Sequence, residues 1–157
     1  MIKIFFLSLL LLSSQTNNLL FCLPEVDEIA EGTATIQYPN PSTLQIDSSD
    51  KAIINYRSFD IAENESVIIN LPSSDSQVLN RVLGDSASWI LGGLSSNGII
   101  ILVNQKGLFF GPSANVDVGS LIASTRDITN SDFLSSQYNF KRLSLSLFKP
   151  MSSIFFI

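Results

Sequence analysis

The sequence predicts an all-β fold in which the chain turns repeatedly in one sense and lays each short strand on an equivalent strand of the coil below. The strand-like runs are only about three to five residues long, and breakers containing glycine recur about every seven residues. This spacing is too short for sandwich strands joined by hairpins and favours stacked coils. The runs are Ile99–Val103, Leu108–Phe110, Val116–Val118 and Leu121–Ala123.

Composition narrows the class of protein. A length of 157 residues corresponds to one domain that can bury a sizeable core. The 14 acidic and 9 basic residues give a net charge of −5, and no basic cluster is present, so we expect no nucleic-acid partner. Charged residues make up 15% of the chain, whereas serine and asparagine are plentiful. This balance favours a secreted, β-rich surface protein over a cytosolic enzyme.

Few residues here are of the types that catalysis and metal binding use most. The chain has no histidine, the commonest general base and metal ligand. The single cysteine, Cys22, excludes an internal disulfide and a cysteine-based metal site. Asp60, Glu63 and Glu65 have no second acidic cluster opposite them, so we interpret them as a solvated turn rather than a glycosidase pair. We therefore expect no enzyme activity, no cofactor and no metal.

The N-terminus has the pattern of an export signal. Lys3 supplies a positive side chain, Ile4–Leu12 is almost wholly apolar, and Ser13–Asn18 is polar. The apolar run is too short to span a bilayer and is typical of the central region of a signal peptide. We assign residues 1–22 to a signal peptide, with cleavage after Cys22 or near Ser14. A lipidated Cys22, although Phe21 fits a lipoprotein box poorly, and an uncleaved, buried segment are the alternatives.

The first half of the mature chain predicts short strands separated by turns. Tyr38–Ser42 carries two prolines and is expected to be a turn. Leu71–Ser76 is expected to be a loop, and Ser74–Val82 to carry a helical turn without a full apolar stripe. The expected strands are Thr33–Gln37, Thr43–Ile46, Ala52–Asn55, Arg57–Ile61 and Ser66–Asn70.

Two features of the second half bear on the coil hypothesis. Trp89–Leu94 is expected to be a strand that ends in a bend, with Trp89 in the core or capping an open end. A platform for glycan binding is the alternative role for Trp89. Asn97-Gly98 is a strong turn signal, compatible with a hairpin or with a coil corner in left-handed backbone conformations. The continuing short runs favour the corner. Six glycines are expected to be geometric rather than functional: Gly84, Gly92, Gly93, Gly98, Gly111 and Gly119.

The last residues change in character. Leu143, Leu145 and Leu147 alternate with serines, as in one strand, and Ile154–Ile157 is an apolar tail. An exposed tail of this kind favours aggregation. We therefore expect residues 141–157 to be an atypical or truncated end, from a chain cut short or read out of frame.

Five segments resemble, in the same order, motifs of one family. Ile53–Val67 resembles I-I-N-W-x-x-F-x-I-x-x-x-E-x-V, and Val78–Val82 resembles V-x-N-R-V. Ile90–Gly98 resembles I-x-G-x-L-x-x-N-G, Asn104–Gly111 is similar to N-P-N-G-I-x-F-G, and Ala114–Thr125 resembles the coil that ends in A-S-T. These motifs characterise the N-terminal secretion domain, also called the haemagglutination-activity domain, of two-partner-secretion exoproteins. The family includes filamentous haemagglutinins and high-molecular-weight adhesins.

The resemblance, which covers residues 43–140, implies a fold and a function. The fold is a right-handed parallel β-helix with N-terminal capping strands, over residues 23–140. The function is a secretion address: the Sec machinery exports the chain to the periplasm of a Gram-negative envelope. There an outer-membrane β-barrel transporter with periplasmic recognition domains receives it. The chain is then secreted or displayed at the surface, where the domain nucleates folding of later coils.

The resemblance also gives candidate recognition residues. Asn104–Leu108 lacks the family's proline and second asparagine, and the separate N-P-N-L motif is absent, so the adhesin branch is the nearer one. For Asn104 and Gly107 the alternative is a corner with left-handed backbone and a ladder of asparagine side chains. For Asn80 and Arg81 the alternative is satisfying backbone groups near a bend. The candidates are Asn80, Arg81, Asn97, Gly98, Asn104, Gly107, Leu108 and Gly111.

Two other functions stay open at this stage. One is a surface adhesin that binds host glycans or cells directly, and its partner would be a host surface. The other is a β-helical enzyme acting on polysaccharides, which is less favoured because the chain shows no acidic cluster on one face of the coil.

Overall fold

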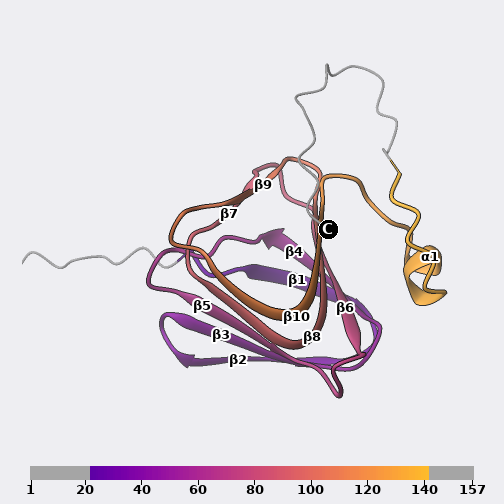
Figure 1. The fold of residues 1–157 in the computed structure, drawn as a ribbon, viewed down its shortest axis with the longest axis horizontal. Helices are drawn as coiled ribbons and strands as arrows, with labels where there is room; N and C mark the ends of the chain where they lie inside the picture. The colour runs from indigo at the N-terminus through magenta and orange to yellow at the C-terminus, as the bar shows by residue number, and fades with distance from the viewer. Residues whose placement is uncertain (1–21, 142–157) are drawn as a thin grey trace, which may run out of the picture.

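The chain winds into a right-handed parallel β-helix with a triangular cross-section (Figure 1). The structure, a computed structural model, describes residues 22–141. Its strands are β1 (Glu25–Glu31), β2 (Ala34–Asn40), β3 (Thr43–Ser48), β4 (Ala52–Ser58), β5 (Ser66–Asn70), β6 (Gln77–Val82), β7 (Ser88–Ile90), β8 (Gly93–Asn104), β9 (Leu108–Phe110) and β10 (Asn115–Ser124). They are followed by α1 (Asn130–Leu134). The prediction of stacked, parallel short strands is confirmed.

Stacked parallel strands form the three sides of the triangle, two of them from one sheet that bends at β8. On one side β4, β6, the second half of β8 and the second half of β10 lie in register, for example Leu79 beside Ile101. On the next side β3, β5 and the first halves of β8 and β10 are paired. The third side consists of β7 and β9, with Ile61 bridged to Ile90 below them. Strand β8 therefore bends around a corner and contributes to two sides.

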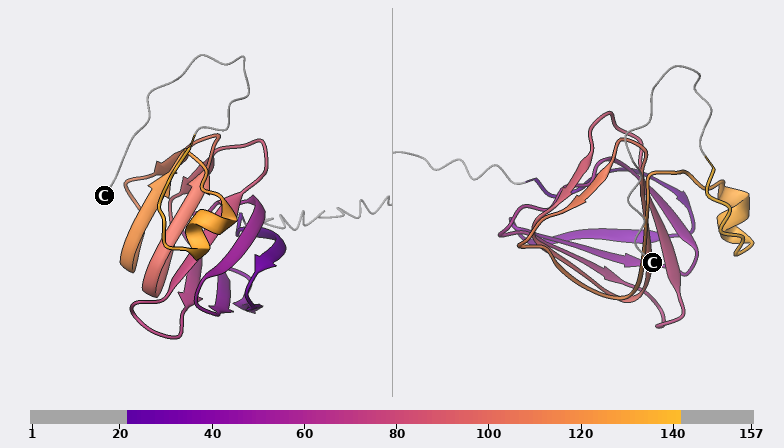
Figure 2. Two further views of the ribbon diagram at one scale, coloured as in Figure 1. Left: turned by 90° about the vertical axis from the view of Figure 1, so that its right-hand side faces the viewer. Right: turned by 45° about the horizontal axis from the view of Figure 1, so that its top comes forward.

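Antiparallel strands close the N-terminal end of the coil (Figure 2). β1 pairs with β4 and β2 pairs with β3, which confirms the expectation of N-terminal capping strands. β1 itself was not predicted. β2 extends through Pro39, which the sequence placed in a turn. Because β2 is an edge strand and its register is irregular between Gln37 and Asn40, the missing N–H of Pro39 is tolerated there.

Alternate residues of the strands fill the interior of the coil. Ile54, Tyr56, Ile69, Leu94 and Leu102 are among the fully buried residues of this core. A fully buried aliphatic side chain contributes roughly 1.5–3 kcal/mol relative to an exposed one. Because every coil supplies a few such residues at equivalent positions, each coil buries its apolar side chains against its neighbours.

A second apolar cluster lies outside the coil, on the side formed by β4, β6 and β8. Ile53, Leu79 and Ile101 point outward there, and Phe133 of α1 covers them. We call residues 126–141, which include α1, the strap. This side is therefore buried on both faces, which explains the continuous apolar run at the end of β8.

Two element predictions were wrong. Residues 77–82, expected to belong to a helical turn, form β6 and are all buried, because the strap covers the outward side chains and hides the alternation of a strand. Arg57–Ile61 is not a separate strand: β4 continues to Ser58, and Ile61 makes only an isolated bridge. The strand ends before Phe59, whose buried ring packs edge-on against Tyr56.

Two predictions fall outside the described residues. One is the signal peptide, of which only Cys22 is described. The other is the C-terminal tail after Lys141, with its expected strand at Leu143–Leu147. Among residues 22–141 there is no helix long and apolar enough to cross a membrane.

Candidate functional site

Asn104 and Gly107 form a tight corner between β8 and β9. The Asn104 side chain is fully buried and donates from Nδ2 to the Ser86 carbonyl at 3.0 Å and to Ser88 Oγ at 2.9 Å, while its Oδ1 accepts the Lys106 N–H at 2.9 Å. Gly107 has φ = +131°, a conformation that favours glycine. The left-handed corner is therefore present at Gly107 but not at Asn104. The predicted ladder of asparagines is absent from these contacts, because Asn104 bonds to serines of the coil below.

Leu108 and Gly111 continue this segment along the third side. Leu108 is partly buried against the interior core. The Gly111 N–H donates to the Ile90 carbonyl at 2.9 Å, and a Cβ atom at Gly111 would lie 2.4 Å from the Leu91 side chain. A larger residue at Gly111 would therefore require the Leu91 side chain to move.

Asn97 and Gly98 lie at the corner inside β8, and the hairpin alternative is excluded because β8 pairs in parallel on both sides of them. The expected left-handed backbone is wrong for both residues, since neither has positive φ. The Asn97 side chain instead makes two hydrogen bonds with the backbone of Leu71. Its Nδ2 donates to the Leu71 carbonyl at 2.7 Å, and its Oδ1 accepts the Leu71 N–H at 2.8 Å. Gly98 is needed because a Cβ would lie 2.6 Å from the Ser76 carbonyl oxygen.

Asn80 points into the core from β6. Its Oδ1 accepts the Tyr56 hydroxyl at 2.8 Å, and Nδ2 donates to the Ile101 carbonyl at 3.4 Å. Burial raises the pKa of Tyr56 well above its usual range, so the phenol stays protonated and donates to Asn80. The pair satisfies two polar groups that would otherwise be costly to bury.

Arg81, next in the chain, points to the opposite side of β6 and holds the strap. Its Nε pairs with Asp127 at 2.9 Å, and its NH groups donate to the Ile128 carbonyl at 2.7 Å and to Asn130 Oδ1 at 3.0 Å. The side chain is 10% exposed. Arg81 is thus engaged within the folded domain rather than presented to solvent.

The candidates do not form one surface and lie in three places. Asn80 and Arg81 neighbour the end of β8, because Val82 is in register with Asn104. Asn97 and Gly98 lie at the corner inside β8, and Gly111 follows β9 on the third side. Except for Asn97, these side chains are buried or partly buried, so the sequence located structural corners and core contacts better than an exposed recognition surface.

Two residues were wrongly interpreted from sequence. Glu65, expected in a solvated turn, is buried, and its carboxylate accepts the Ala62 N–H at 2.9 Å and the Cys22 N–H at 2.6 Å. Trp89, expected in the core or capping an open end, is 53% exposed and stacks on Phe109 with ring centroids 4.5 Å apart. No sequence signal distinguished either position, because both depend on residues of other coils. Residues 22–141 contain no cluster of three or more side chains suited to a metal.

Comparison with known proteins gives consistent matches. A family model described as the TPS secretion domain matches residues 29–150. A heme/hemopexin-binding protein of Haemophilus influenzae is 34% identical over 120 residues, and the same-named protein of a second strain is 31% identical over 106 residues. These matches cover 76% and 68% of this chain but only 13% and 12% of the relatives, so the chain spans about an eighth of their length.

A solved structure agrees with the fold. The crystal structure of the HMW1 secretion domain from Haemophilus influenzae superposes with a TM-score of 0.73 at 33% identity, covering 76% of this chain and 32% of that one. TPS stands for two-partner secretion, in which an outer-membrane transporter is the partner of an exoprotein that crosses the Gram-negative envelope. On the family model, the two relatives and this structure, the chain belongs to the TPS secretion domains and is the secretion-targeting domain of an exoprotein.

Proposed function

We propose that the transporter recognises this chain before it folds, through the segments around Asn80-Arg81 and Asn104–Gly111. The observation that supports this is burial: Asn80 and Asn104 are fully inaccessible in the folded coil, and Arg81 is held by the strap. The transporter can contact these side chains only while the chain is unfolded. Folding then removes them from the partner, which makes release outside the cell directional.

Strand addition accounts for affinity in this scheme. An extended segment such as Leu108–Phe110 can add to a sheet edge of the transporter's periplasmic recognition domains through main-chain hydrogen bonds. Its alternate side chains then occupy pockets that give specificity. The mature chain needs no disulfide, since Cys22 is the only cysteine and belongs to the segment that we propose is cleaved. An unlinked chain can pass through a barrel in extended form.

The same scheme includes the steps before and after recognition by the transporter, which are export to the periplasm and folding outside the cell. Residues 1–22 direct export by the Sec machinery, and residues 23–140 fold outside the cell. Once formed, the final coil presents β10 as a template for further coils. Heme or hemopexin binding, which the names of the relatives indicate, belongs to those much longer proteins. We assign to this chain the secretion step alone, without enzymatic activity.

Secretion by a partner can be measured directly. The full chain, expressed together with an outer-membrane transporter of a two-partner system, is expected to reach the medium, and without a transporter it is expected to stay in the periplasm. Cell fractionation and immunoblotting check the distribution. Retention with every transporter tried contradicts the proposed function.

Recognition of the open chain is tested by the timing of binding. The chain is diluted from urea onto immobilised periplasmic recognition domains, either at once or after refolding is complete. Immediate capture is expected, with little capture after refolding. The variant Gly92→Ala, in which a Cβ would meet two backbone oxygens, is expected to fold less stably and to stay capturable for longer than its neighbour Gly93→Ala. Equal capture of the fully folded chain overturns recognition before folding.

A further inference from the structure

Trp89 is held in an unusual position for a large aromatic residue. It lies on the outside of the third side, where β7 pairs with β9 and Trp89 is in register with Phe109. The two rings are nearly parallel, with an interplanar angle of 14° and centroids 4.5 Å apart. Phe109, from the following coil, thus covers one face of the indole and fixes its orientation. The other face looks toward the preceding coil.

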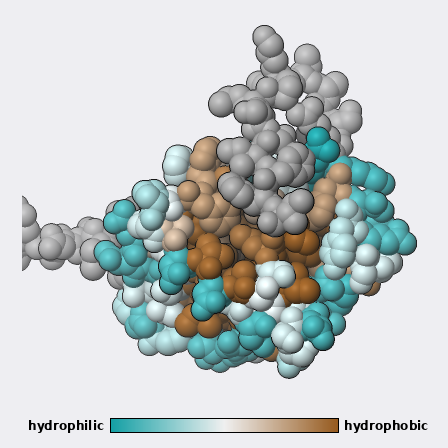
Figure 3. All heavy atoms as spheres, viewed as in Figure 1, coloured by the Kyte–Doolittle hydropathy of each residue, from teal (hydrophilic) through white to brown (hydrophobic). Residues whose placement is uncertain are grey.

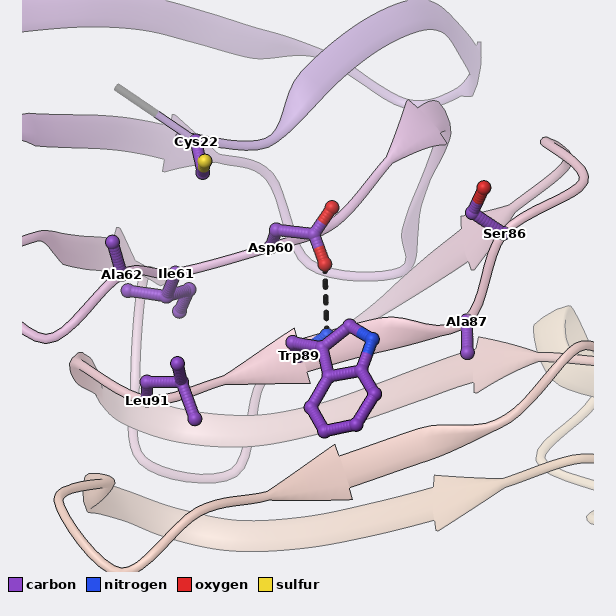
Figure 4. Close-up of a pocket in the computed structure, with 8 residues that line it drawn as sticks. All are labelled: Cys22, Asp60, Ile61, Ala62, Ser86, Ala87, Trp89 and Leu91. Atoms are coloured by element: carbon purple, nitrogen blue, oxygen red, sulfur yellow. Dashed lines mark hydrogen bonds between the residues drawn. The ribbon is translucent and has the colours of Figure 1, made fainter. Parts of the chain in front are cut away.

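That free face borders a pocket of about 300 Å³ (Figure 4). Ile61 and Ala62 come from the preceding coil, and Ala87 and Leu91 come from the segment that contains β7. Phe109 does not line the pocket, which agrees with its position on the opposite face of the indole. The pocket therefore offers a flat aromatic wall and an apolar surround.

Asp60 is the charged residue among those that line this pocket. Its Oδ1 accepts the Trp89 backbone N–H at 2.8 Å, which fixes the carboxylate beside the indole. Among residues 22–141, no lysine or arginine pairs with Asp60, and its second carboxylate oxygen accepts no hydrogen bond. A fixed carboxylate in partly apolar surroundings thus lacks a counter-ion.

We propose that this pocket binds an arginine side chain of a protein partner. The planar guanidinium stacks on the free indole face, as the third layer after Phe109 and Trp89, and donates to the unoccupied oxygen of Asp60. Guanidinium is weakly hydrated, stacks on aromatic rings and donates in a planar fork, so it uses both the ring and the carboxylate. The net charge of −5 further favours a cationic partner.

The chemistry distinguishes arginine from other occupants. A lysine ammonium is a compact, strongly hydrated charge that makes no use of a flat wall. A neutral aromatic ring stacks on Trp89 but leaves Asp60 without a counter-ion. Cys22 contributes to one wall, but neither contact of the guanidinium depends on it. The binding is therefore expected whether or not the chain is cleaved after Cys22, and it does not depend on the secretion step.

The single tryptophan of the chain makes the test specific. The full-length chain is titrated with N-acetyl-arginine methylamide while the fluorescence and the indole N–H resonance of Trp89 are followed. Matched titrations use the lysine and citrulline analogues, since citrulline has the shape of arginine without its charge. A dissociation constant on the order of millimolar is expected for one cation–π contact and one partly exposed ion pair.

Two variants separate the site from general charge effects. Asp60→Asn keeps an oxygen that accepts the Trp89 N–H but removes the charge, and it is expected to weaken arginine binding at least about threefold. Asp75→Asn, an exposed acid on another loop, is the control and is expected to bind like the wild type. Equal responses to arginine, lysine and citrulline overturn the proposal, and so does unchanged arginine binding by Asp60→Asn.

Discussion

At the scale of single residues, buried polar groups set strict requirements inside a narrow coil. The interior has room for only a few side chains per turn, so each polar atom that enters it needs a partner within the same or the next coil. Asn80 with Tyr56 and Asn104 with Ser88 are examples. Such pairs tie the sequence of one coil to that of its neighbour, which makes their replacement costly.

The Tyr56 phenol predicts a dependence of stability on alkaline pH. Its pKa is raised in the folded state by burial, whereas in the unfolded chain it is about 10. The protonated phenol therefore makes its full contribution to the free energy of unfolding below about pH 10, the pKa in the unfolded chain. This contribution decreases as the pH rises above that value. Between pH 9 and pH 11 the wild type is expected to lose about 1.4 kcal/mol more than Tyr56→Phe, measured by urea unfolding.

The same variant is informative at neutral pH. Tyr56→Phe leaves Asn80 Oδ1 buried without its donor and is expected to cost about 1–2 kcal/mol at pH 7. Tyr38→Phe is the control: Tyr38 is exposed and makes only the smaller, coulombic contribution to the raised pKa of Tyr56, so this variant should keep nearly the alkaline slope of the wild type. An unchanged slope in Tyr56→Phe would show that the phenol does not control alkaline unfolding.

Adjacent glycines at one corner give a second prediction. A Cβ atom at Gly92 would lie 2.2 Å from the Ala62 carbonyl oxygen and 2.3 Å from that of Glu65, so backbone would have to move. At Gly93 the nearest atom is the Ser66 hydroxyl at 3.1 Å. Gly92→Ala is expected to destabilise the domain by about 2–3 kcal/mol and Gly93→Ala by clearly less, as measured by thermal or urea unfolding. Equal losses contradict the close-packing explanation.

At the scale of elements, the strap converts an ordinary outward sheet face into a buried one. Phe133 supplies the apolar contact, and Arg81 supplies the polar one, through Asp127 and the Ile128 carbonyl. The helix α1 is short, but Thr129 caps it by accepting the Asp132 N–H. The strap is therefore held by contacts with the coil more than by its own secondary structure.

Removal of the Arg81 side chain should release the strap. Arg81→Ala leaves Asp127 without its cation in a mostly buried site and is expected to cost about 3 kcal/mol. Limited proteolysis should then cut residues 126–141 faster than in the wild type. Arg57→Ala is the control, because Arg57 pairs with Glu25 and Asp27 on the exposed surface. Equal cleavage of the two variants would contradict the role of Arg81.

At the scale of the whole molecule, the stack has closed and open ends. Antiparallel β1 and β2 close the start of the coil, whereas β10 pairs only with β8 in the described part. On the face seen in Figure 3, apolar side chains gather over the centre of the triangle. Partly buried Leu108, Phe110 and Leu121 belong to this last turn. The middle coils therefore have two neighbours each, and the last has one.

This arrangement predicts a gradient of local stability along the coil axis. Amide hydrogens in β6 and in the second half of β8 are expected to exchange slowest, because strands flank them on both sides. Those of β9 and β10 are expected to exchange faster, by about tenfold or more. Hydrogen exchange followed by mass spectrometry measures the order. Uniform protection across the strands would mean that the domain opens only as a whole.

The sequence by itself determined the coil. Short runs such as Ile99–Val103 and Leu108–Phe110, separated by glycine breakers, are local patterns that survive in the fold as β8 and β9. Five ordered segments were sufficient to indicate the family. The interpretation of glycines as geometric agrees with the backbone atoms that a Cβ would meet at Gly84, Gly92, Gly98 and Gly119. These features depend on near neighbours in the chain, so they can be derived without knowing which segments meet.

Only the tertiary structure decided which distant residues each coil contacts. Residues 77–82 looked helical because Phe133 and Ile128, about fifty residues later, cover their outer side and remove the alternation. Glu65 is buried because the chain at Cys22 passes over it. Trp89 lies outside the core, where Phe109 of the next coil stacks on it. The physical reason is the same in each case: burial and pairing depend on register between distant segments, which no local pattern encodes.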